Sequence, residues 1–188
     1  MQHRVKNNFQ VILASISLQK RRFDPASDAQ RALDHVANRI NAISLAHDQL
    51  APRSDLHAVD LAGYLRALCA SIESQVDDVA IDLEADEVEL GIDRAVPLGL
   101  ILNEAATNSV KHAFGPVGGR ITATLKTGVG YGEARLVVAD NGRGIRNPRP
   151  DGSGLKLISS LARQIGGRVE RESSDGGTRV EVTFPVIT

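Results

Sequence analysis

Residues 98–114 read Leu98-Gly-Leu-Ile-Leu-Asn-Glu-Ala-Ala-Thr-Asn-Ser-Val-Lys-His-Ala-Phe114. The apolar side chains recur at helical spacing: Leu98, Ile101, Leu102, Ala105 and Ala106. This spacing predicts an amphipathic helix with one buried side. Glu104, Asn108 and His112 are four residues apart and stack along one side of that helix. Lys111 lies close to the same line. The stripe suits a metal ion and phosphates, although a solvated helix face can have the same composition.

Composition excludes several classes of protein. The chain has 188 residues, 42% hydrophobic and 24% charged, enough for one medium domain or two small ones. A formal net charge of −1 and 3% aromatic residues argue against a nucleic-acid binder. The single cysteine, Cys69, rules out a disulfide framework and favours a cytoplasmic location. No apolar run reaches membrane-spanning length.

Glycine is unevenly distributed along the chain. The first 62 residues contain none, whereas 14 of the 17 glycines follow residue 114. This asymmetry predicts a purely helical front unit and a loop-rich α/β back unit. The stretch Ala51-Pro-Arg-Ser-Asp55 resembles a linker, so we place the units at residues 1–54 and 55–188.

The front unit is predicted to be a helical hairpin. A first helix over residues 2–23 is broken by Asp24-Pro25, and Asp28 is a candidate cap for a second. The second apolar stripe comprises Leu33, Val36, Ile40, Ile43, His47 and Leu50. Such a hairpin has little core of its own, so we expect residues 1–50 to pair with a second copy in a dimeric four-helix bundle.

The back unit alternates helices and strands. Asp60 is a candidate cap for a helix to about residue 76, and Pro97 is expected in the first turn of the central helix. A last helix is expected over residues 155–165. Strands are predicted at residues 79–83, 87–90, 120–126, 133–139, 168–172 and 178–184. Helices on one face of a mixed sheet make this an α/β sandwich.

Two glycine-containing segments follow in the back unit. Asp140-Asn-Gly142-Arg-Gly144 comes directly after the apolar run 136–139, so a buried strand delivers a carboxylate that can accept a hydrogen bond from an exocyclic amine. A plain turn is the alternative, but no return strand follows closely. Gly152-Ser-Gly154 precedes a helix and therefore suits phosphate, without being a Walker loop.

The segment His3-Arg-Val-Lys-Asn-Asn-Phe-Gln10 carries a histidine on the expected outer side of the first helix, with Asn7 one turn along. A largely uncharged histidine is a competent nucleophile, and the amide could orient a water or a phosphoryl oxygen. An ordinary surface histidine would look the same. Of the other histidines, we expect His47 to be a packing residue, and His35 and His57 to face solvent without a chemical role.

The order of these motifs is more specific than any one of them. Glu104-x-x-x-Asn108-x-x-Lys111, Asp-x-Gly-x-Gly, Gly-x-Gly-Leu and a final Gly-Gly-Thr178 resemble the N, G1, G2 and Gly-Thr elements of the histidine kinase/gyrase/Hsp90/MutL superfamily, whose ATP-binding domain has the Bergerat fold. The front hairpin resembles the phosphoacceptor segment of sensor histidine kinases of the HisKA_2 and HWE type. Together the resemblance covers nearly the whole chain.

The resemblance implies a role for each matching residue. His3 would be the phosphoacceptor, and Asn7 could support the reverse, phosphatase-like reaction. Asn108 would ligate Mg²⁺ on the phosphates of ATP, with Glu104 helping through a water or acting as a base. The remaining nucleotide contacts would come from Lys111, His112, Asp140, Gly142, Gly144, Gly152, Gly154, Leu155 and Thr178. The partner would be a response-regulator receiver domain, which takes the phosphoryl group on an aspartate.

Two departures from the family pattern leave the base open. Arg4 follows His3 where many histidine kinases have an acid, and Glu104 stands where many have Asn. Two other functions remain possible: a phosphotransfer scaffold that no longer binds ATP, and an ATPase or Ser/Thr-directed kinase of the same superfamily. The intact glycine motifs argue against the first and the His3 hairpin against the second. Because His3 stands at the very start, we expect a sensor domain upstream.

Overall fold

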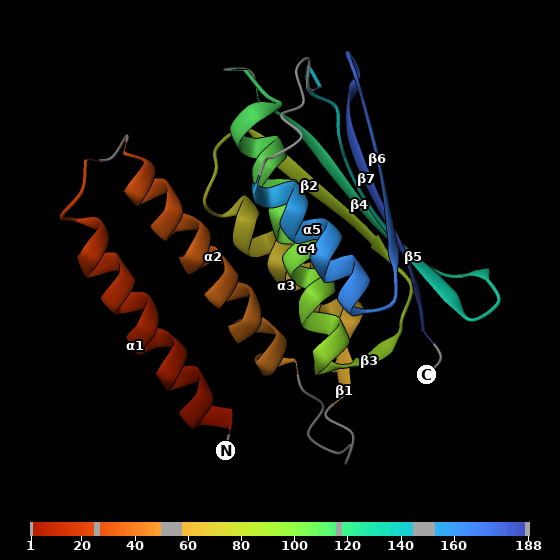
Figure 1. The fold of residues 1–188 in the computed structure, drawn as a ribbon, viewed down its shortest axis with the longest axis horizontal. Helices are drawn as coiled ribbons and strands as arrows, with labels where there is room; N and C mark the ends of the chain where they lie inside the picture. The colour runs from red at the N-terminus through yellow and green to blue at the C-terminus, as the bar shows by residue number, and fades with distance from the viewer. Residues whose placement is uncertain (1, 25–26, 50–57, 116–117, 145–152, 187–188) are drawn as a thin grey trace.

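Two antiparallel helices open the chain, α1 (Gln2–Lys20) and α2 (Asp28–Asp48) (Figure 1). The computed structural model describes residues 2–24, 27–49, 58–115, 118–144 and 153–186, and of residues 2–4 and 153 the backbone only. Ion pairs join the helices at both ends, Lys6 with Asp48 at 3.0 Å and Lys20 with Asp34.

Both predicted boundaries of the hairpin need correction. The first helix ends at Lys20, three residues before the predicted end. The cap of α2 is Ser27 and not Asp28, because the Ser27 hydroxyl accepts the backbone N–H of Gln30 at 3.2 Å. Asp28 is the first helical residue, where its negative charge still favours the helix N-terminus.

The rest of the chain forms a mixed sheet with helices on one face, as predicted. The helices are α3 (Leu61–Glu73), α4 (Ile92–His112) and α5 (Ser153–Gln164). The sheet has the order β2-β4-β5-β7-β6, in which only the β2–β4 pair is parallel. Its strands are β2 (Val79–Ala85), β4 (Gly119–Gly130), β5 (Glu133–Asp140), β6 (Arg168–Ser174) and β7 (Gly177–Pro185).

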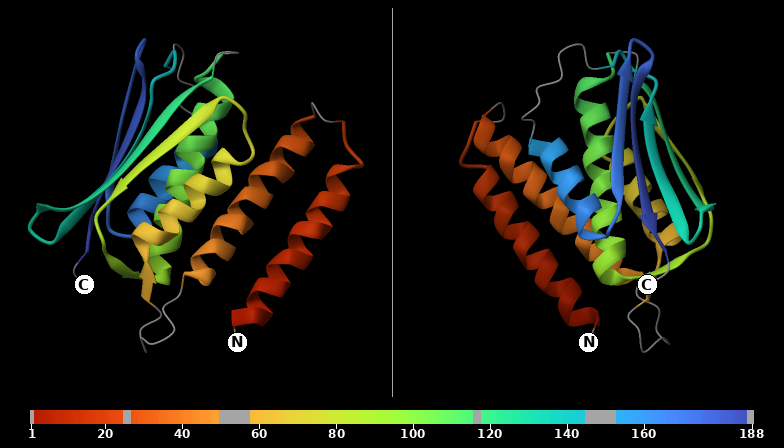
Figure 2. Two further views of the ribbon diagram at one scale, coloured as in Figure 1. Left: turned by 180° about the vertical axis from the view of Figure 1, so that it is seen from behind. Right: turned by 45° about the vertical axis from the view of Figure 1, so that its right-hand side comes forward.

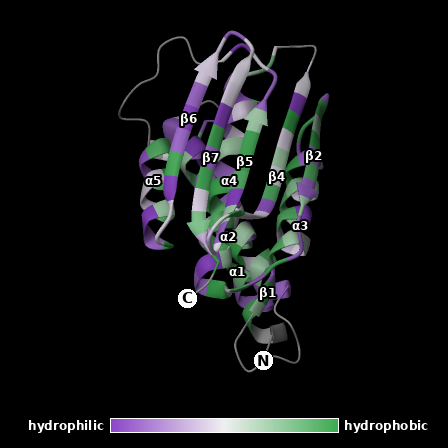
Figure 3. Cartoon of the chain, turned by 90° about the vertical axis from the view of Figure 1, so that its right-hand side faces the viewer, coloured by the Kyte–Doolittle hydropathy of each residue, from purple (hydrophilic) through white to green (hydrophobic). Residues whose placement is uncertain are grey.

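Alternating burial explains why the helices lie on one face only. On β5, for example, Ala134, Leu136, Val138 and Asp140 point inward and are buried. Figures 2 and 3 show α3, α4 and α5 on one face of the sheet, whose other face is open. That open face carries cross-strand ion pairs such as Arg120 with Asp82 and Lys126 with Glu84, which suit contact with water.

The structure also contains a small two-stranded sheet, of which only the second strand was predicted. The strand β1 (Ala58–Asp60) pairs antiparallel with β3 (Glu89–Gly91). A three-residue strand has too short a pattern to be recognised in sequence. Asp60 then caps α3, as predicted, by accepting the backbone N–H of Gly63 at 3.0 Å.

The central helix α4 is covered on both sides. It begins at Ile92, so Pro97 lies in its second turn and the prediction of a first-turn proline is wrong. α3, α5 and the sheet pack on one side of α4, and α2 packs on the other. Tyr64 of α3 is fully buried and donates to the Ala42 carbonyl of α2 at 2.9 Å. It reaches this position past Gly99, where a Cβ would lie 2.1 Å from the phenol oxygen.

The face of α2 that packs against α4 is therefore not the predicted apolar stripe. Ala42 and Ala46 are the buried residues of α2, and their small side chains allow the close approach to α4. Several large apolar side chains of the hairpin remain exposed: Val11, Ile12, Leu18, Phe23 and Val36. Among the described residues, no helix is both long and apolar enough to cross a membrane.

Candidate nucleotide site

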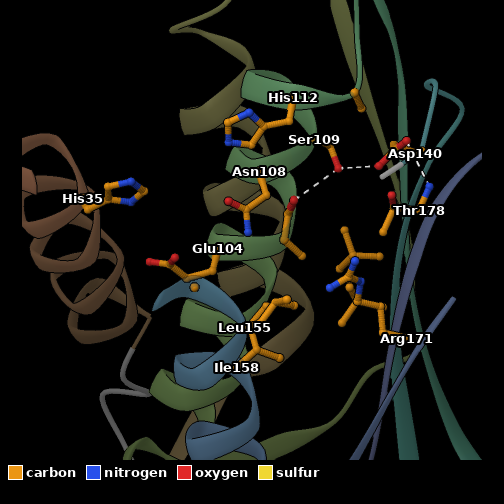
Figure 4. Close-up of a pocket in the computed structure, with 16 residues that line it drawn as sticks. His35, Glu104, Asn108, Ser109, His112, Asp140, Leu155, Ile158, Arg171 and Thr178 are labelled. Carbon is orange, nitrogen blue, oxygen red and sulfur yellow. Dashed lines mark hydrogen bonds between the residues drawn. The ribbon is translucent and has the colours of Figure 1, made fainter. Parts of the chain in front are cut away.

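A cavity of about 320 Å³ opens between α4, α5 and the sheet, and α2 borders one end of it (Figure 4). Its volume suits a small-molecule ligand. The polar ladder predicted on α4 lines it through Glu104, Asn108 and His112. Asp140, Gly144, Gly154, Leu155 and Thr178 line it as well. Most of the residues predicted for one site are therefore brought together.

Asp140 forms one end of the cavity and is held by hydrogen bonds on both oxygens. Its Oδ1 accepts the backbone N–H groups of Gly142 at 2.9 Å and Thr178 at 3.2 Å. Its Oδ2 accepts the Ser109 hydroxyl of α4 at 2.7 Å. With 8% of its surface exposed, this carboxylate is fixed in position before any ligand arrives. Such an acceptor suits the exocyclic amine of a base.

Two glycines allow the backbone to close around Asp140. Gly177 has φ +128, and a Cβ there would lie 1.9 Å from the Asp140 carbonyl oxygen. Gly144 has φ +62, and its Cβ would lie 1.9 Å from the Ser174 carbonyl oxygen. A side chain at either position would strain the backbone and displace the loop. Gly142, by contrast, packs against Ala113 and does not line the cavity.

Glu104 and Asn108 form the other end of the cavity. The Glu104 side chain is 2% exposed, and its Oε1 accepts the Nε of Arg39 from α2 at 2.9 Å. Gly154 approaches both residues closely, since its Cβ would lie 3.3 Å from Glu104 Oε2 and 3.3 Å from Asn108 Nδ2. A glycine here keeps the start of α5 close to the polar ladder, as phosphate binding at a helix N-terminus requires.

His35 of α2 lies beside this end, contrary to the prediction that it faces solvent. It is half-buried, and its Nε2 lies 3.3 Å from the Lys111 ammonium. Burial, helped by the charge of Lys111, lowers the pKa of His35. The imidazole is therefore neutral at pH 7 and can accept a hydrogen bond from Lys111. Lys111 itself borders a second, smaller cavity between α2, α3 and α4 and not the nucleotide cavity.

The catalytic residues predicted on α1 are separated from this cavity. His3 belongs to α1, although its side chain lies outside the described residues, as does Gly152. Asn7 is exposed on α1, next to the Lys6–Asp48 ion pair. The ring of His47 packs on Phe9 with centroids 5.7 Å apart, so the prediction of a packing residue is confirmed.

Four polar or charged residues of the cavity region were not predicted: Ser109, His35, Arg39 and Arg171. Ser109 looked like an ordinary helix residue because nothing local marks its contact with Asp140. His35 and Arg39 are four apart and share the side of α2 that carries Ala42 and Ala46. The small-residue spacing of those two alanines was the one available sign that this side of α2 faces another helix.

The donor set fits a magnesium ion that arrives with phosphates. Within the described residues there is no group of three or more His, Cys, Asp or Glu side chains that could hold a metal alone. Mg²⁺ needs less from the protein, because it keeps several waters and takes phosphate oxygens together with one or two side chains. Glu104 and Asn108, one turn apart on the cavity wall, can supply such oxygens.

Two protein-family models match this chain. A model of the histidine kinase-, DNA gyrase B- and HSP90-like ATPases matches residues 93–188, and the chain belongs to this family. The HisKA_2 histidine kinase model matches residues 1–76, ahead of that domain. The two matches stand in the order of a sensor histidine kinase core, which confirms the resemblance seen in the motifs.

Individual relatives agree with this assignment. The chain is similar to blue-light-activated histidine kinase 2 of Erythrobacter litoralis (26% identical over 99% of this chain and 56% of the relative). It is also similar to the sensor histidine kinase PdtaS of Mycobacterium tuberculosis (28% identical over 98% of this chain and 38% of the relative). The chain thus spans about half or less of these relatives.

Solved structures show the same fold. The histidine kinase domain of the Erythrobacter litoralis EL346 blue-light-activated histidine kinase superimposes with a TM-score of 0.74, at 20% identity over 96% of each chain. The catalytic domain of histidine kinase ThkA superimposes with a TM-score of 0.56, at 18% identity, over 69% of this chain and 94% of that one. The predicted helical hairpin followed by an α/β sandwich is confirmed.

Proposed function

We propose that the chain binds Mg·ATP in the cavity, phosphorylates His3, and transfers the phosphoryl group to an aspartate of a response-regulator receiver domain. The observation that carries this proposal is that the two ends of the cavity hold different polar groups. Asp140 offers a fixed carboxylate for the adenine amine, and Glu104 and Asn108 offer oxygens for the metal and phosphates. The match of residues 1–76 to a histidine kinase model supports the acceptor.

Phosphoryl transfer demands mainly positioning and charge neutralisation, which these residues can provide. Asn108 and Glu104 would hold the magnesium ion, whose contribution is to neutralise charge on the phosphates. Gly154 brings backbone near the same point. His112 lines the phosphate side of the cavity, and Leu155 and Thr178 complete its walls. Lys111 would reach the phosphates only after leaving His35.

The transfer step requires the ATP-binding part to move relative to the hairpin. Because Lys6 pairs with Asp48, the start of α1 lies beside the end of α2. His35, which borders the cavity, is 13 residues before Asp48, or about 20 Å along the helix. We infer that the arrangement in Figure 1 is a resting one. The α/β part then approaches His3 of the same chain or of a second copy.

In this resting arrangement Arg39 occupies the carboxylate that we propose as a helper in catalysis. Glu104 can act as a base, or hold a metal-bound water, only with an oxygen free to face the reacting groups. Departure of α2 would release Oε1 from Arg39. Movement of the hairpin would thus both deliver His3 and free Glu104. Arg4, the neighbour of His3, cannot serve as a base at neutral pH.

The test is incubation with ATP labelled at the γ-phosphate. We expect a label on the protein that is labile in acid and stable in base, as a phosphohistidine is. His3→Gln should abolish it, whereas His57→Gln, at a histidine with no proposed role, should leave it unchanged. Label that persists in His3→Gln would refute the acceptor. ATP hydrolysis without label would favour the ATPase reading, and absence of ATP binding would favour the scaffold.

Asn7 is proposed to support the reverse, phosphatase-like reaction. It is exposed one turn after His3, where its amide can orient a water toward a phosphoryl group. Asn7→Ala should lower dephosphorylation of the phosphorylated receiver domain and leave labelling of His3 intact. The exposed Asn8, whose amide points from a different side of α1, provides the control variant Asn8→Ala. Unchanged dephosphorylation by Asn7→Ala would remove this role.

We further propose that residues 1–50 form a homodimer, that the hairpin unit ends near residue 54, and that the protein works in the cytoplasm. Val11 and Leu18, 69% and 64% exposed, are the most exposed large apolar residues of α1 and would be covered by a second copy. Light scattering should give a dimer for the wild type and a monomer for a Val11→Glu, Leu18→Glu variant. A dimer that survives both changes would exclude this face.

The proposed location rests on the one cysteine of the chain. The thiol of Cys69 is free and buried, and burial raises its pKa to about 11.

A further inference from the structure

Arg171 on β6 faces the cavity from the wall opposite α4 (Figure 4). It is half-buried, and its guanidinium has no hydrogen bond or ion pair within the part of the chain that the structure describes. The other arginines of the large sheet all have carboxylate partners: Arg120 with Asp82, Arg135 with Glu181, Arg168 with Glu133, and Arg179 with Glu181. Arg171 therefore stands apart from them both in its position and in its missing partner.

The position is one where the fold favours an apolar side chain. Side chains alternate along a strand, so Arg171 shares its face of β6 with Val169, which packs against the core. A partly buried cation with no partner disfavours the folded chain. A ligand in the cavity would supply the missing partner, because the guanidinium already points into that space.

The sheet register shows which part of a nucleotide would lie beside it. Arg171 is opposite Val180, and Val180 is opposite Val138, so these three cavity-lining residues form one row across the sheet. The neighbouring row contains Thr178, whose N–H binds Asp140. The two rows are two residues apart, or about 7 Å. A purine ring whose amine meets Asp140 would extend over the row of Arg171.

The proposed phosphate ligands lie on a different wall. Glu104 and Asn108 belong to α4, next to α2, whereas Arg171 projects from the far edge of the sheet. Building on the proposed ATP binding, we propose that Arg171 is a base-contacting residue. Its guanidinium packs on the purine ring of the bound nucleotide and takes no part in holding the phosphates. Attraction between a guanidinium and an aromatic face is the interaction that such a placement allows.

Ligands with different numbers of phosphates test this assignment directly. Calorimetric titration of Arg171→Met with adenosine, ADP and Mg·ATP should show the same loss of affinity for all three, about 3- to 10-fold. Arg171→Lys should recover part of the loss because it keeps the charge. Arg168→Met, on the same strand but on the open face, should bind like the wild type. A loss that grows with the number of phosphates would show a phosphate contact and overturn the proposal.

A second measurement separates a ligand contact from a structural role. Met fills similar space without a charge, so the ligand-free Arg171→Met variant should melt at the same or a higher temperature than the wild type. Lower stability together with unchanged nucleotide affinity would overturn the proposal. If the wild type binds no adenine nucleotide, the proposed function itself fails. If it binds and Arg171→Met binds equally well, only the assignment of Arg171 fails.

Discussion

The two ends of the nucleotide cavity are built in different ways. At the proposed base end, Asp140 is held by Ser109, Gly142 and Thr178, all of which belong to the α/β part. At the proposed phosphate end, α2 supplies the contacts: Arg39 binds Glu104, and His35 lies against Lys111. The base end is complete without the hairpin, whereas the phosphate end is shared with it.

This difference suggests how nucleotide binding and hairpin position are linked. A ligand shifts a conformational equilibrium only through a difference in its affinity for the two states. Contacts at the base end are the same wherever the hairpin lies, so they provide affinity without coupling. Contacts at the proposed phosphate end would compete with Arg39 and His35 for the same α4 side chains, so they would favour release of α2. The coupling is expected to be reciprocal.

Removal of the Asp140 carboxylate should have the largest effect. Asp140→Ala loses the amine acceptor and the anchor for two backbone N–H groups, so affinity for adenosine and for Mg·ATP should fall together, by about 100-fold. Titration calorimetry measures both. Asp82→Ala, at an exposed carboxylate on β2, is the matched control. Affinity within a few-fold of the wild type would mean that Asp140 does not read the base.

Loss of the Ser109 hydroxyl should have a smaller effect of the same kind. Ser109→Ala leaves Asp140 Oδ2 without its buried donor, and both ligands should bind about 5- to 10-fold more weakly. Thr107→Ala on the same helix is the control, because that hydroxyl bonds only to carbonyls of its own helix. A weaker affinity for Mg·ATP with an unchanged affinity for adenosine would mean that Ser109 acts on the phosphates and not on the base.

Acid should weaken the contact between α2 and α4 modestly. In the observed arrangement α2 is docked on α4, and burial, followed by the charge of Lys111, lowers the pKa of His35. Arg39 also lowers this pKa, whereas Glu104 and Asp34 raise it. A group that binds fewer protons when docked stabilises docking above its ordinary pKa of about 6.5 and loses this contribution as the pH falls below it. The protection of α2 amides against hydrogen exchange, corrected for the intrinsic pH dependence of exchange, should therefore fall between pH 7.5 and 5.5. His35→Gln should flatten that dependence, and an equally steep profile in the variant would exclude His35.

Sequence alone predicts the residues whose spacing or motif is local. Asp140 follows a buried strand and precedes glycines, and Glu104 and Asn108 share a helix face, so both ends of the cavity could be predicted. The contacts between distant segments could not. Nothing near Ser109 shows that Asp140 lies beside it, and nothing near Arg39 shows that Glu104 does.

Rules based on residue type also gave wrong predictions at particular positions. Pro97 was expected in a first turn because an interior proline removes a helix hydrogen bond, yet packing of α4 on both sides tolerates it. The apolar stripe of α2 was read as its packing face, but Ala42 and Ala46 make the contact with α4. Small residues bury little apolar surface, so a pattern based on large side chains overlooks the closest approach between helices.

The most direct test of the link between hairpin and phosphate end is the effect of Arg39→Gln on two ligands. With Glu104 Oε1 released from the guanidinium, Mg·ATP should bind more tightly, by about fivefold or more, while affinity for adenosine stays the same. Arg31→Gln, on an exposed turn of the same helix, is the control and should change neither. Equal changes for adenosine and Mg·ATP, or none for either, would contradict the account.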